Sequence, residues 1–261
     1  MLTHAFVFAA GYGTRLRPYT LTVPKPMLDV YGWPMVAYGL AGLARAGIRH
    51  ATVNAAWLAE GFAPLPDLGP RLGLDVALSV QPHPLQHGGD LAFATDFLDR
   101  LAIDETFLAA NGDTLYDLDG PALQGLAAEP SLARPLVILG DPTPDGPLRV
   151  RDGRLVGIGD VTYGPPGGTP SGDAPEERWD DAGLKLFHAS VRAYLPAPGT
   201  EMSLHGTEGL IGRMIAAGAT VGVRQAPVLD RAEVGTVAEY EARDTNEPLR
   251  RLADRLVGIG A

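Results

Sequence analysis

Apolar positions follow two different spacings along this chain, one typical of strands and one typical of helices. A short apolar run that ends at Gly11 predicts a buried strand, and apolar residues at helical spacing between Pro34 and Gly47 predict a helix. The same reasoning predicts strands at residues 4–10, 52–54, 74–80, 106–110, 136–139, 148–150, 155–158, 182–187 and 220–224, and helices at residues 34–46, 56–62, 90–102, 208–217 and over the last 25 residues. Repeated strand–helix–strand units predict a mostly parallel sheet with helices on both faces.

The pattern changes after Gly120, where short strand candidates are separated by turns and residues 163–177 form a Gly- and Pro-rich loop. No linker separates two independent cores. We therefore expect one α/β domain over residues 1–261, with a Rossmann-like mixed sheet and a smaller β insertion. Its parts are a first half over about 1–120, a second over about 121–235, and C-terminal helices after 236.

Composition removes several classes of protein. The 261 residues are 46% apolar, enough for a full core, and contain no cysteine, which excludes disulfides, thiolate metal sites and thiol nucleophiles. No apolar run approaches the roughly 18 residues of a membrane-spanning helix. The first apolar stretch is too short for a signal sequence and lacks a basic start. These features predict a cytoplasmic protein with no membrane partner.

Charge is distributed unevenly along the chain. A net charge of −10 argues against nucleic acid as a partner, because a phosphate-backbone binder needs a basic face. The first acidic residue is Asp29, so Arg15, Arg17 and Lys25 precede any neutralising carboxylate. Lysine occurs only at Lys25 and Lys185, against 19 arginines, which indicates a need for a compact point charge there. The alternative, that both lysines merely survived a compositional bias, stays open for Lys185.

The most informative segment is a Gly-rich loop behind the first predicted strand. It reads Ala9-Ala10-Gly11-Tyr12-Gly13-Thr14-Arg15-Leu16-Arg17-Pro18, followed by Thr20 and by Pro24-Lys25-Pro26-Met27. Backbone N–H groups of such a loop can approach an anion closely, and the loop adds fixed cations. It is not a P-loop, and Leu16 stands where a dinucleotide fingerprint needs its third glycine, which disfavours an oxidoreductase. A lone Gly-Tyr-Gly turn would be unremarkable, but its combination with Pro-Lys-Pro is far more specific.

The segment resembles the signature of the sugar-1-phosphate nucleotidyltransferases, or NDP-sugar pyrophosphorylases, which is Ala-Ala-Gly-x-Gly-Thr-Arg-Leu-x-Pro, then Thr, then Pro-Lys-Pro-Met. Further matches are Asn54 with Ala56-Trp57-Leu58, Pro84-Leu85 with Gly88-Gly89, Asn111-Gly112-Asp113, Ala182-Gly183-Leu184 and Val234-Gly235-Thr236. Among subfamilies, the chain is most similar to N-acetylmuramate-1-phosphate uridylyltransferases and their mannose-1-phosphate guanylyltransferase-like relatives.

The resemblance implies a reaction and a set of residues for it. A sugar phosphate oxygen attacks the α-phosphorus of a nucleoside triphosphate in line and expels pyrophosphate. Because that nucleophile is already ionised, positioning and charge neutralisation must supply the catalysis. By resemblance, Arg15 holds the triphosphate, Lys25 neutralises the two reacting phosphates and Asp113 binds Mg²⁺. The implied nucleotide-binding residues are Ala10, Gly11, Gly13, Thr14, Arg15, Gln81 and Gly88, and the implied sugar-phosphate-binding residues are Asn111, Gly146, Asp181, Gly183 and Lys185.

Two carboxylates are candidates for the metal. Asp113 ends an Asn-Gly-Asp segment that alone would suggest a turn, but here follows an apolar strand. The family's second metal carboxylate directly precedes Val-Gly-Thr, where this chain has Glu233 rather than aspartate. The longer side chain can still reach a cation, and Asp230 is a reserve candidate.

The base-recognition and sugar segments depart from the family pattern. Gln81 matches the Gln-Pro opening of thymidylyl- and uridylyltransferases, which favours UTP or dTTP, whereas many members carry a Glu-Lys-Pro segment that is absent here. Lys185, which would share a strand face with Gly183, could supply the missing cation. Asp181 stands where relatives have an asparagine that binds a sugar hydroxyl.

Two hypotheses follow from these matches and departures. The first is an active Mg²⁺-dependent nucleotidyltransferase that makes a UDP- or dTDP-sugar, with an N-acetylmuramate-1-phosphate uridylyltransferase-like activity as the best guess and a GDP-sugar as the alternative. The second is a catalytically silent protein that binds nucleotide or sugar for regulation. The altered metal carboxylate and the missing Glu-Lys-Pro segment favour the second, and the intact Arg15, Lys25 and Asp113 favour the first. The oligomeric state stays open.

Overall fold

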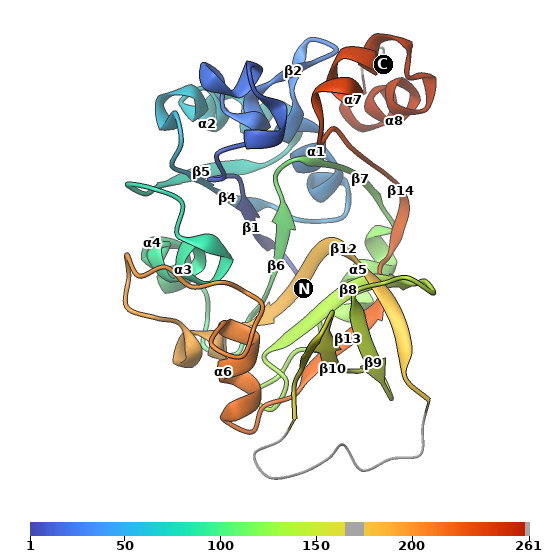
Figure 1. The fold of residues 1–261 in the computed structure, drawn as a ribbon. Helices are drawn as coiled ribbons and strands as arrows, with labels where there is room; N and C mark the ends of the chain where they lie inside the picture. Colours follow the sequence, from blue (N-terminus) through green and yellow to red (C-terminus); the bar gives the residue numbers. More distant parts are fainter. Residues whose placement is uncertain (165–174, 259–261) are drawn as a thin grey trace. The chain divides into compact units, whose positions relative to one another are not determined.

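The computed structural model describes residues 1–164 and 175–258 (Figure 1), so most of the loop expected at 163–177 lies outside the described residues. The chain divides into two compact units. Unit 1 comprises Met1–Pro84, Ala110–Gly125 and Pro227–Ala261, and unit 2 comprises Leu85–Ala109 and Leu126–Ala226. The single functional domain expected over residues 1–261 stays a prediction.

Unit 1 contains three parallel strands that the sequence predicts. They are β1 (His4–Phe8), β4 (His50–Ala55) and β5 (Asp75–Val80), with β4 paired to both of the others. Ala5, Phe6 and Val7 of β1 are buried, as the apolar run indicates. Because parallel neighbours run in the same direction, the chain leaves β1 and β4 at the same edge of the sheet.

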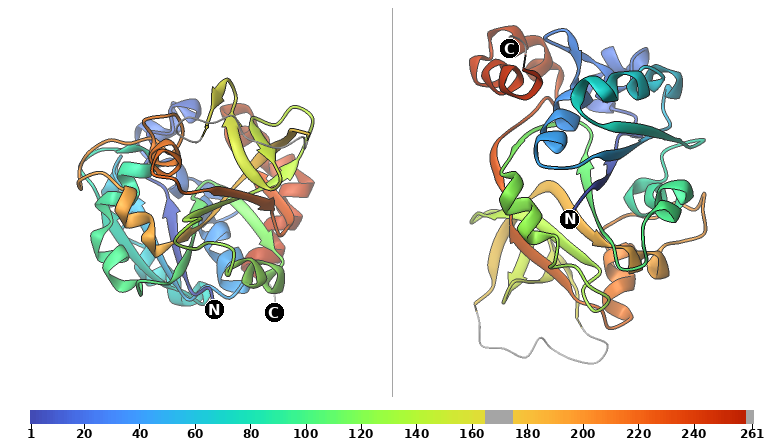
Figure 2. Two further views of the ribbon diagram at one scale, coloured as in Figure 1. Left: turned by 90° about the horizontal axis from the view of Figure 1, so that it is seen from below. Right: turned by 180° about the vertical axis from the view of Figure 1, so that it is seen from behind.

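Helices of unit 1 contribute to a hydrophobic cluster: α1 (Met35–Arg45), α7 (Val237–Glu241) and α8 (Glu247–Val257). The short α2 (Leu65–Leu68) packs against β5 instead. Met35 and Tyr38 of α1 share this cluster with Leu249, Leu252 and Leu256 of α8. Figures 1 and 2 show the C-terminal helices, in red, beside α1. This packing fixes α8 to the hydrophobic core of unit 1.

Several elements of unit 1 escape prediction. β7 (Thr114–Leu118) pairs antiparallel with β14 (Val228–Glu233), and Thr114 lies opposite Glu233. The others are the short pair β2 (Asp29–Val30) and β3 (Trp33–Pro34), and α5 (Gly120–Leu126), which runs into unit 2. The pairing of β7 with β14 brings a segment from near the end of the chain next to residue 113.

Unit 2 contains a mixed sheet. Its strands are β8 (Leu136–Pro142), β9 (Leu148–Arg151), β10 (Arg154–Ile158), β11 (Val161–Thr162), β12 (Glu177–His188), β13 (Val221–Gln225) and most of β6 (Thr106–Asn111). β8 pairs with β13 in parallel, whereas β12 pairs antiparallel with β8 and β9, and β10 pairs antiparallel with β9, β11 and β13.

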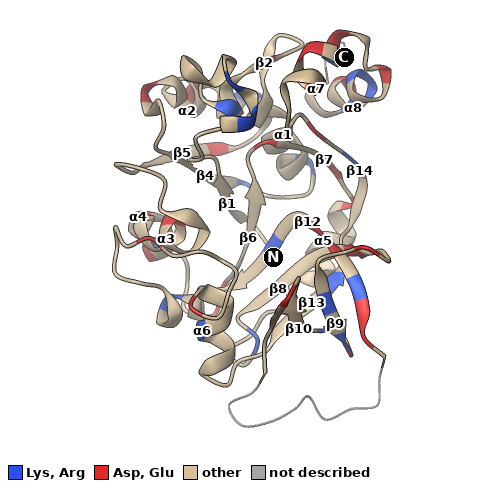
Figure 3. Cartoon of the chain, viewed as in Figure 1, with Lys and Arg blue, Asp and Glu red and all other residues tan. Residues whose placement is uncertain are grey.

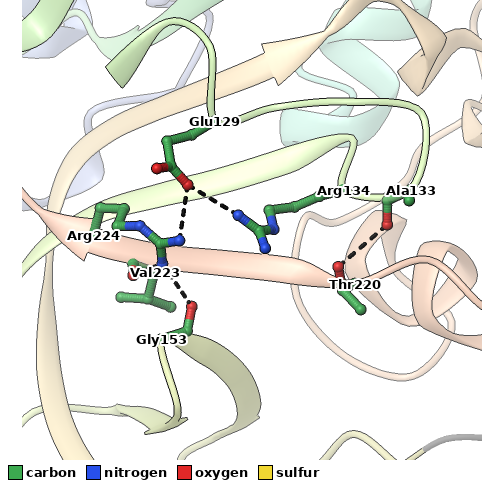
Figure 4. Close-up of polar contacts among 7 residues, drawn as sticks. All are labelled: Glu129, Ala133, Arg134, Gly153, Thr220, Val223 and Arg224. Carbon is green, nitrogen blue, oxygen red and sulfur yellow. Dashed lines mark hydrogen bonds and ion pairs between the residues drawn. The ribbon is translucent and has the colours of Figure 1, made fainter. Parts of the chain in front are cut away.

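An ion-pair cluster joins three segments of unit 2 (Figure 4). Glu129 accepts hydrogen bonds from Arg134 Nη1 at 2.9 Å and Arg224 Nη2 at 2.8 Å. Arg224 Nη1 also donates to the carbonyl of Gly153, in the turn between β9 and β10, at 3.0 Å. The cluster therefore ties β13 to that turn and to the segment before β8.

Two predicted helices are wrong in their extent. The helix expected at 90–102 is two helices, α3 (Gln86–Phe93) and α4 (Thr95–Arg100), because Ala94 between them has a non-helical ψ of 54°. The helix expected at 56–62 shrinks to a 3₁₀ turn at Ala59–Phe62, since Leu58 adopts a left-handed φ of 51° that no α-helix continues. The helix expected at 208–217 is present as α6 (Leu210–Ala216).

Within the residues described, no helix combines the length and apolar character needed to cross a bilayer.

Candidate active site

The start of the Gly-rich loop is held by a side chain of the neighbouring strand. Asn54, near the end of β4, accepts hydrogen bonds through Oδ1 from the backbone N–H groups of Ala9 at 2.5 Å and Ala10 at 3.2 Å. Asn54 is fully buried, so this contact lies within the core of unit 1. Gly11 follows as an exposed residue, with no atom within 4 Å of the position of an added Cβ. The loop therefore begins at a fixed point, held by Asn54, and its backbone is exposed at Gly11.

Gly13 is required where the loop folds back on itself. Its φ of +61° is costly for other residues, and an added Cβ would lie 3.0 Å from Cβ of Lys25 and 3.0 Å from Cγ2 of Thr20. The Thr20 hydroxyl also donates to the Gly13 carbonyl at 2.8 Å. Thr14 and Arg15 then enter a 3₁₀ turn and are exposed. Figure 3 shows the cations of this segment as blue bands without a red one among them.

Two predicted catalytic residues meet in the structure. Lys25 Nζ lies 2.6 Å from Oδ2 of Asp113, although 88 positions separate them. Lys25 is only 8% exposed, and the prolines on either side restrict its backbone. On the other side, the N–H of Gly112 donates to the Phe8 carbonyl at 2.9 Å, which holds the residue before Asp113 against β1. An ammonium and a carboxylate are thus fixed beside the Gly-rich loop.

Asp113 and Glu233, the two carboxylates predicted to hold Mg²⁺, belong to segments that the pairing of β7 with β14 brings together. Glu233 ends β14 opposite Thr114, the residue after Asp113, and Thr114 Oγ1 donates to Glu233 Oε1 at 3.4 Å. Asp230, the reserve candidate, is instead ion-paired to Arg255 Nη2 at 2.5 Å. Within the described ranges, no three His, Asp or Glu side chains gather as a metal site. A metal here would take its remaining ligands from water and substrate, as Mg²⁺ commonly does.

Gln81 and Gly88, the predicted base-side residues, lie in different units. In unit 1, Gln81 is buried and its Nε2 donates to the His83 carbonyl at 3.1 Å. In unit 2, the N–H of Gly88 donates to the Met202 carbonyl at 2.9 Å, and an added Cβ would lie 2.8 Å from Met202 Cγ. Both residues therefore have structural contacts of their own, and their roles toward a nucleotide stay predictions.

The second lysine of the chain is also paired. Lys185 of β12 is 4% exposed, and its Nζ lies 2.8 Å from Oδ2 of Asp181. The N–H of Gly183 donates to Oδ1 of the same carboxylate at 2.8 Å, and Gly183 takes a φ of +78° where the β12–β8 register shifts. The structure thus joins three of the five predicted sugar-phosphate residues into one cluster.

The other two predicted sugar-phosphate residues are Gly146 and Asn111. Gly146 is packed under β12, where an added Cβ would come within 2.2 Å of the Trp179 carbonyl group. Asn111 ends β6 and belongs to unit 1.

His205 is a residue of this region that the sequence analysis missed. It lines an open pocket of about 530 Å³ in unit 2, together with Gln86, Glu201, Met202, Ser203, Gly206, Thr207, Glu208, Gly209 and Arg213. Although His205 keeps an exposed part, desolvation by the atoms around it lowers its pKa, the charge of Lys185 lowers it further, and Asp181 opposes both. The imidazole is therefore mainly neutral at pH 7 and lies within the electrostatic influence of Lys185 and Asp181. No local motif marks it, because this proximity depends on how the 201–209 segment folds.

Comparison with known proteins identifies the family of the chain. A family model described as nucleotidyl transferase matches residues 4–137, more than half of the chain, and the chain belongs to that family. The resemblance seen in the sequence is confirmed.

Relatives and solved structures define the match further. The chain is 38% identical to N-acetylmuramate alpha-1-phosphate uridylyltransferase of Neisseria meningitidis serogroup B over 116 residues, which are 44% of this chain and 48% of the relative. It is 33% identical to mannose-1-phosphate guanylyltransferase of Mycobacterium tuberculosis over 172 residues, 64% of this chain and 47% of the relative. The chain thus spans about half the length of these curated relatives.

A solved structure confirms the fold over the whole chain. The inositol-1-phosphate CTP transferase from T. maritima superimposes with a TM-score of 0.69 at 19% identity, covering 100% of this chain and 98% of that one. The predicted Rossmann-like α/β fold with a mixed sheet is confirmed.

Proposed function

We propose that this protein is a sugar-1-phosphate nucleotidyltransferase, which condenses a nucleoside triphosphate with a sugar 1-phosphate to give an NDP-sugar and pyrophosphate. The observation that carries the proposal is the 2.6 Å contact of Lys25 with Asp113 beside the open Gly-rich loop. This contact supports a site in which Lys25 acts on phosphates and Asp113 binds a metal. The names of the relatives support the same reaction class.

The chemistry needs fixed charges rather than a base. The oxygen of the sugar phosphate forms a bond to the α-phosphorus, the bond from that phosphorus to the bridging oxygen breaks, and pyrophosphate takes the electron pair. No proton moves, because the nucleophile is already ionised. Lys25 offsets the repulsion between the two reacting phosphates, and Arg15 binds the departing pyrophosphate. Backbone N–H groups from Gly11 to Thr14 contact the remaining oxygens, since the N–H of Ala10 already donates to Asn54.

Asp113 and Glu233 would hold Mg²⁺, which supplies charge neutralisation across the phosphate oxygens when bound. The two carboxylates fit this role because Asp113 directly precedes Thr114, the strand partner of Glu233, and because both offer oxygen donors only. Thr114 orients Glu233 through its hydroxyl.

The finer specificity also belongs to this proposal. Gln81 favours a pyrimidine base, so UTP or dTTP is the expected triphosphate, and the best guess is an N-acetylmuramate-1-phosphate uridylyltransferase-like enzyme. GDP-sugar formation is the alternative, since relatives named as guanylyltransferases match as well. The Lys185–Asp181 pair, with neutral His205 beside it, is the proposed site for the sugar phosphate.

The proposed function predicts pyrophosphate release in a coupled assay over UTP, dTTP, GTP and CTP, each combined with a panel of sugar 1-phosphates and Mg²⁺. We expect turnover with a pyrimidine triphosphate and at least one sugar phosphate. Nucleotide binding by calorimetry without turnover would favour the catalytically silent alternative. Absence of both binding and turnover would overturn the proposal.

Lys185→Met is expected to raise the KM for sugar 1-phosphate by about tenfold or more, because a charged hydrogen bond to phosphate contributes about 1.5–3 kcal/mol. The KM for the triphosphate should not change. Arg154→Met, which removes an exposed cation from β10 of the same unit, is the matched control.

The double variant Asp181→Asn/Lys185→Met separates binding from folding, since it leaves no unpaired buried charge. A KM for sugar phosphate that returns to the wild-type value in the double variant would show that Lys185 has only a structural role.

A further inference from the structure

Glu239, in the first turn of α7, makes more contacts than its place on a short surface helix requires. Its Oε2 accepts hydrogen bonds from the N–H of Gly235 at 2.8 Å and of Thr236 at 2.9 Å. In return, Thr236 Oγ1 accepts from the N–H of Glu239 at 3.3 Å, which completes a capping box. One carboxylate oxygen therefore holds two consecutive backbone N–H groups of the 235–236 turn.

The 235–236 turn lies against Arg15 of the Gly-rich loop. An added Cβ on Gly235 would be 3.7 Å from Nη1 and 3.8 Å from Cζ of Arg15, and 3.5 Å from Oε2 of Glu239. The guanidinium of Arg15 thus rests on the backbone that Glu239 fixes. The residue before the turn, Val234, is buried in the same hydrophobic cluster as Leu16, the neighbour of Arg15. The turn and the 3₁₀ segment that carries Arg15 therefore pack against each other in unit 1.

Charge reinforces this contact. The hydrogen bond from Gly235 lowers the pKa of Glu239 most, those with Thr236 lower it too, and the charge of Lys25 lowers it further against the opposing effect of burial. Glu239 is therefore ionised at neutral pH, and both hydrogen bonds to it are of the stronger, charge-assisted kind.

We propose that Glu239 is a positioning residue of the triphosphate site, which acts by holding the 235–236 turn as the support of the Arg15 guanidinium. The inference rests on the proposed function and deepens it, because it assigns a role to a residue outside the loop itself. Without the hydrogen bonds from Gly235 and Thr236 to Glu239, the turn and the Arg15 side chain become more mobile. Binding a triphosphate must then order both groups, which costs conformational entropy.

If Glu239 acted only as a helix cap, its replacement would lower stability without changing triphosphate binding. Thr236→Ala is the matched control for that role. This variant removes the other half of the capping box and is expected to lower the melting temperature, as the loss of an N-cap residue usually does. It leaves both N–H groups bound to Glu239 in place. Glu239→Gln retains an acceptor oxygen for them, whereas Glu239→Ala removes it.

The experiment measures the Kd of UTP by calorimetry in EDTA, without metal or turnover, beside melting temperature and steady-state kinetics. We expect Glu239→Ala to weaken UTP binding by about tenfold, the size of one lost charged contact. Glu239→Gln should restore most of it, and Thr236→Ala should melt earlier with a wild-type Kd. In an Arg15→Ala background, Glu239→Ala should add nothing further, because the two residues act through one contact.

A wild-type Kd in Glu239→Ala, or equal weakening in Thr236→Ala, would overturn the inference and leave the proposed function standing. Additive losses in the double variant would also overturn it. A wild type that binds UTP without turning over any triphosphate would instead refute the proposed function, and the Kd comparison would still decide the role of Glu239.

Discussion

Replacement of Lys25 by methionine is expected to lower kcat for nucleotidyl transfer by about 100- to 1,000-fold, because one preorganised charge contact removed from the transition state typically costs about 2.7–4 kcal/mol. The attacking sugar phosphate and the α-phosphate are both anionic, so their approach is opposed until a cation lies between them. Lys25 is held ready for that position by its flanking prolines and by Gly13, over which its side chain passes.

The loss should be kinetic rather than structural. Lys25 is almost buried, but the side chain of its partner Asp113 keeps 29% of its surface exposed and can be hydrated when the ammonium is gone. We therefore expect a melting temperature close to that of the wild type.

Single-turnover measurement of pyrophosphate release tests this expectation directly. Arg251→Met is the matched control, because it removes one exposed cation of α8, which pairs with Glu247 four residues earlier. A kcat of Lys25→Met that stays near the wild-type value would remove Lys25 from the reaction. A kcat that falls equally in Arg251→Met would point to net charge rather than position.

The parts of this site that could be predicted are those with a local cause. The strand before Gly11 is an unbroken apolar run, and Gly13 stands where the chain must take a positive φ. Lys25 stands out because 19 of the 21 basic residues are arginine, and Asp113 because it follows a buried strand. Apart from the scarcity of lysine, each of these signals lies within a few residues of the feature that it predicts.

The parts that could not be predicted depend on partners far along the chain. β7 and β14 are short and carry charged residues, so neither shows the regular apolar pattern of a buried strand. Their pairing across more than 100 positions leaves no local signal either. The left-handed turn at Leu58 is likewise set by the packing around it rather than by its own preference.

Glu239 lies between these two cases. The Thr-x-x-Glu spacing from Thr236 predicts a capping box by itself. Its contact with the backbone beside Arg15 is visible only in the folded chain.

Asp113→Asn is expected to change two measurements in opposite directions. Turnover at saturating Mg²⁺ should fall about 100-fold or more, because the carboxylate that would hold the metal is lost. In EDTA, however, UTP should bind about fivefold more tightly, since one charge that repels phosphate is removed and Lys25 is released from its 2.6 Å ion pair. A variant that had merely unfolded would lose both turnover and UTP binding.

Two further variants locate the second carboxylate. Glu233→Gln should raise the Mg²⁺ concentration needed for half-maximal activity and weaken Mn²⁺ binding measured by electron paramagnetic resonance. Asp230→Asn, on the same strand but paired to Arg255, should leave both unchanged. The opposite result would make Asp230 the ligand and would require β14 to shift its register against β7.

If Asp113→Asn instead bound UTP more weakly in EDTA, the resting pair of Lys25 and Asp113 would be a support for the nucleotide rather than a contact that the nucleotide must displace.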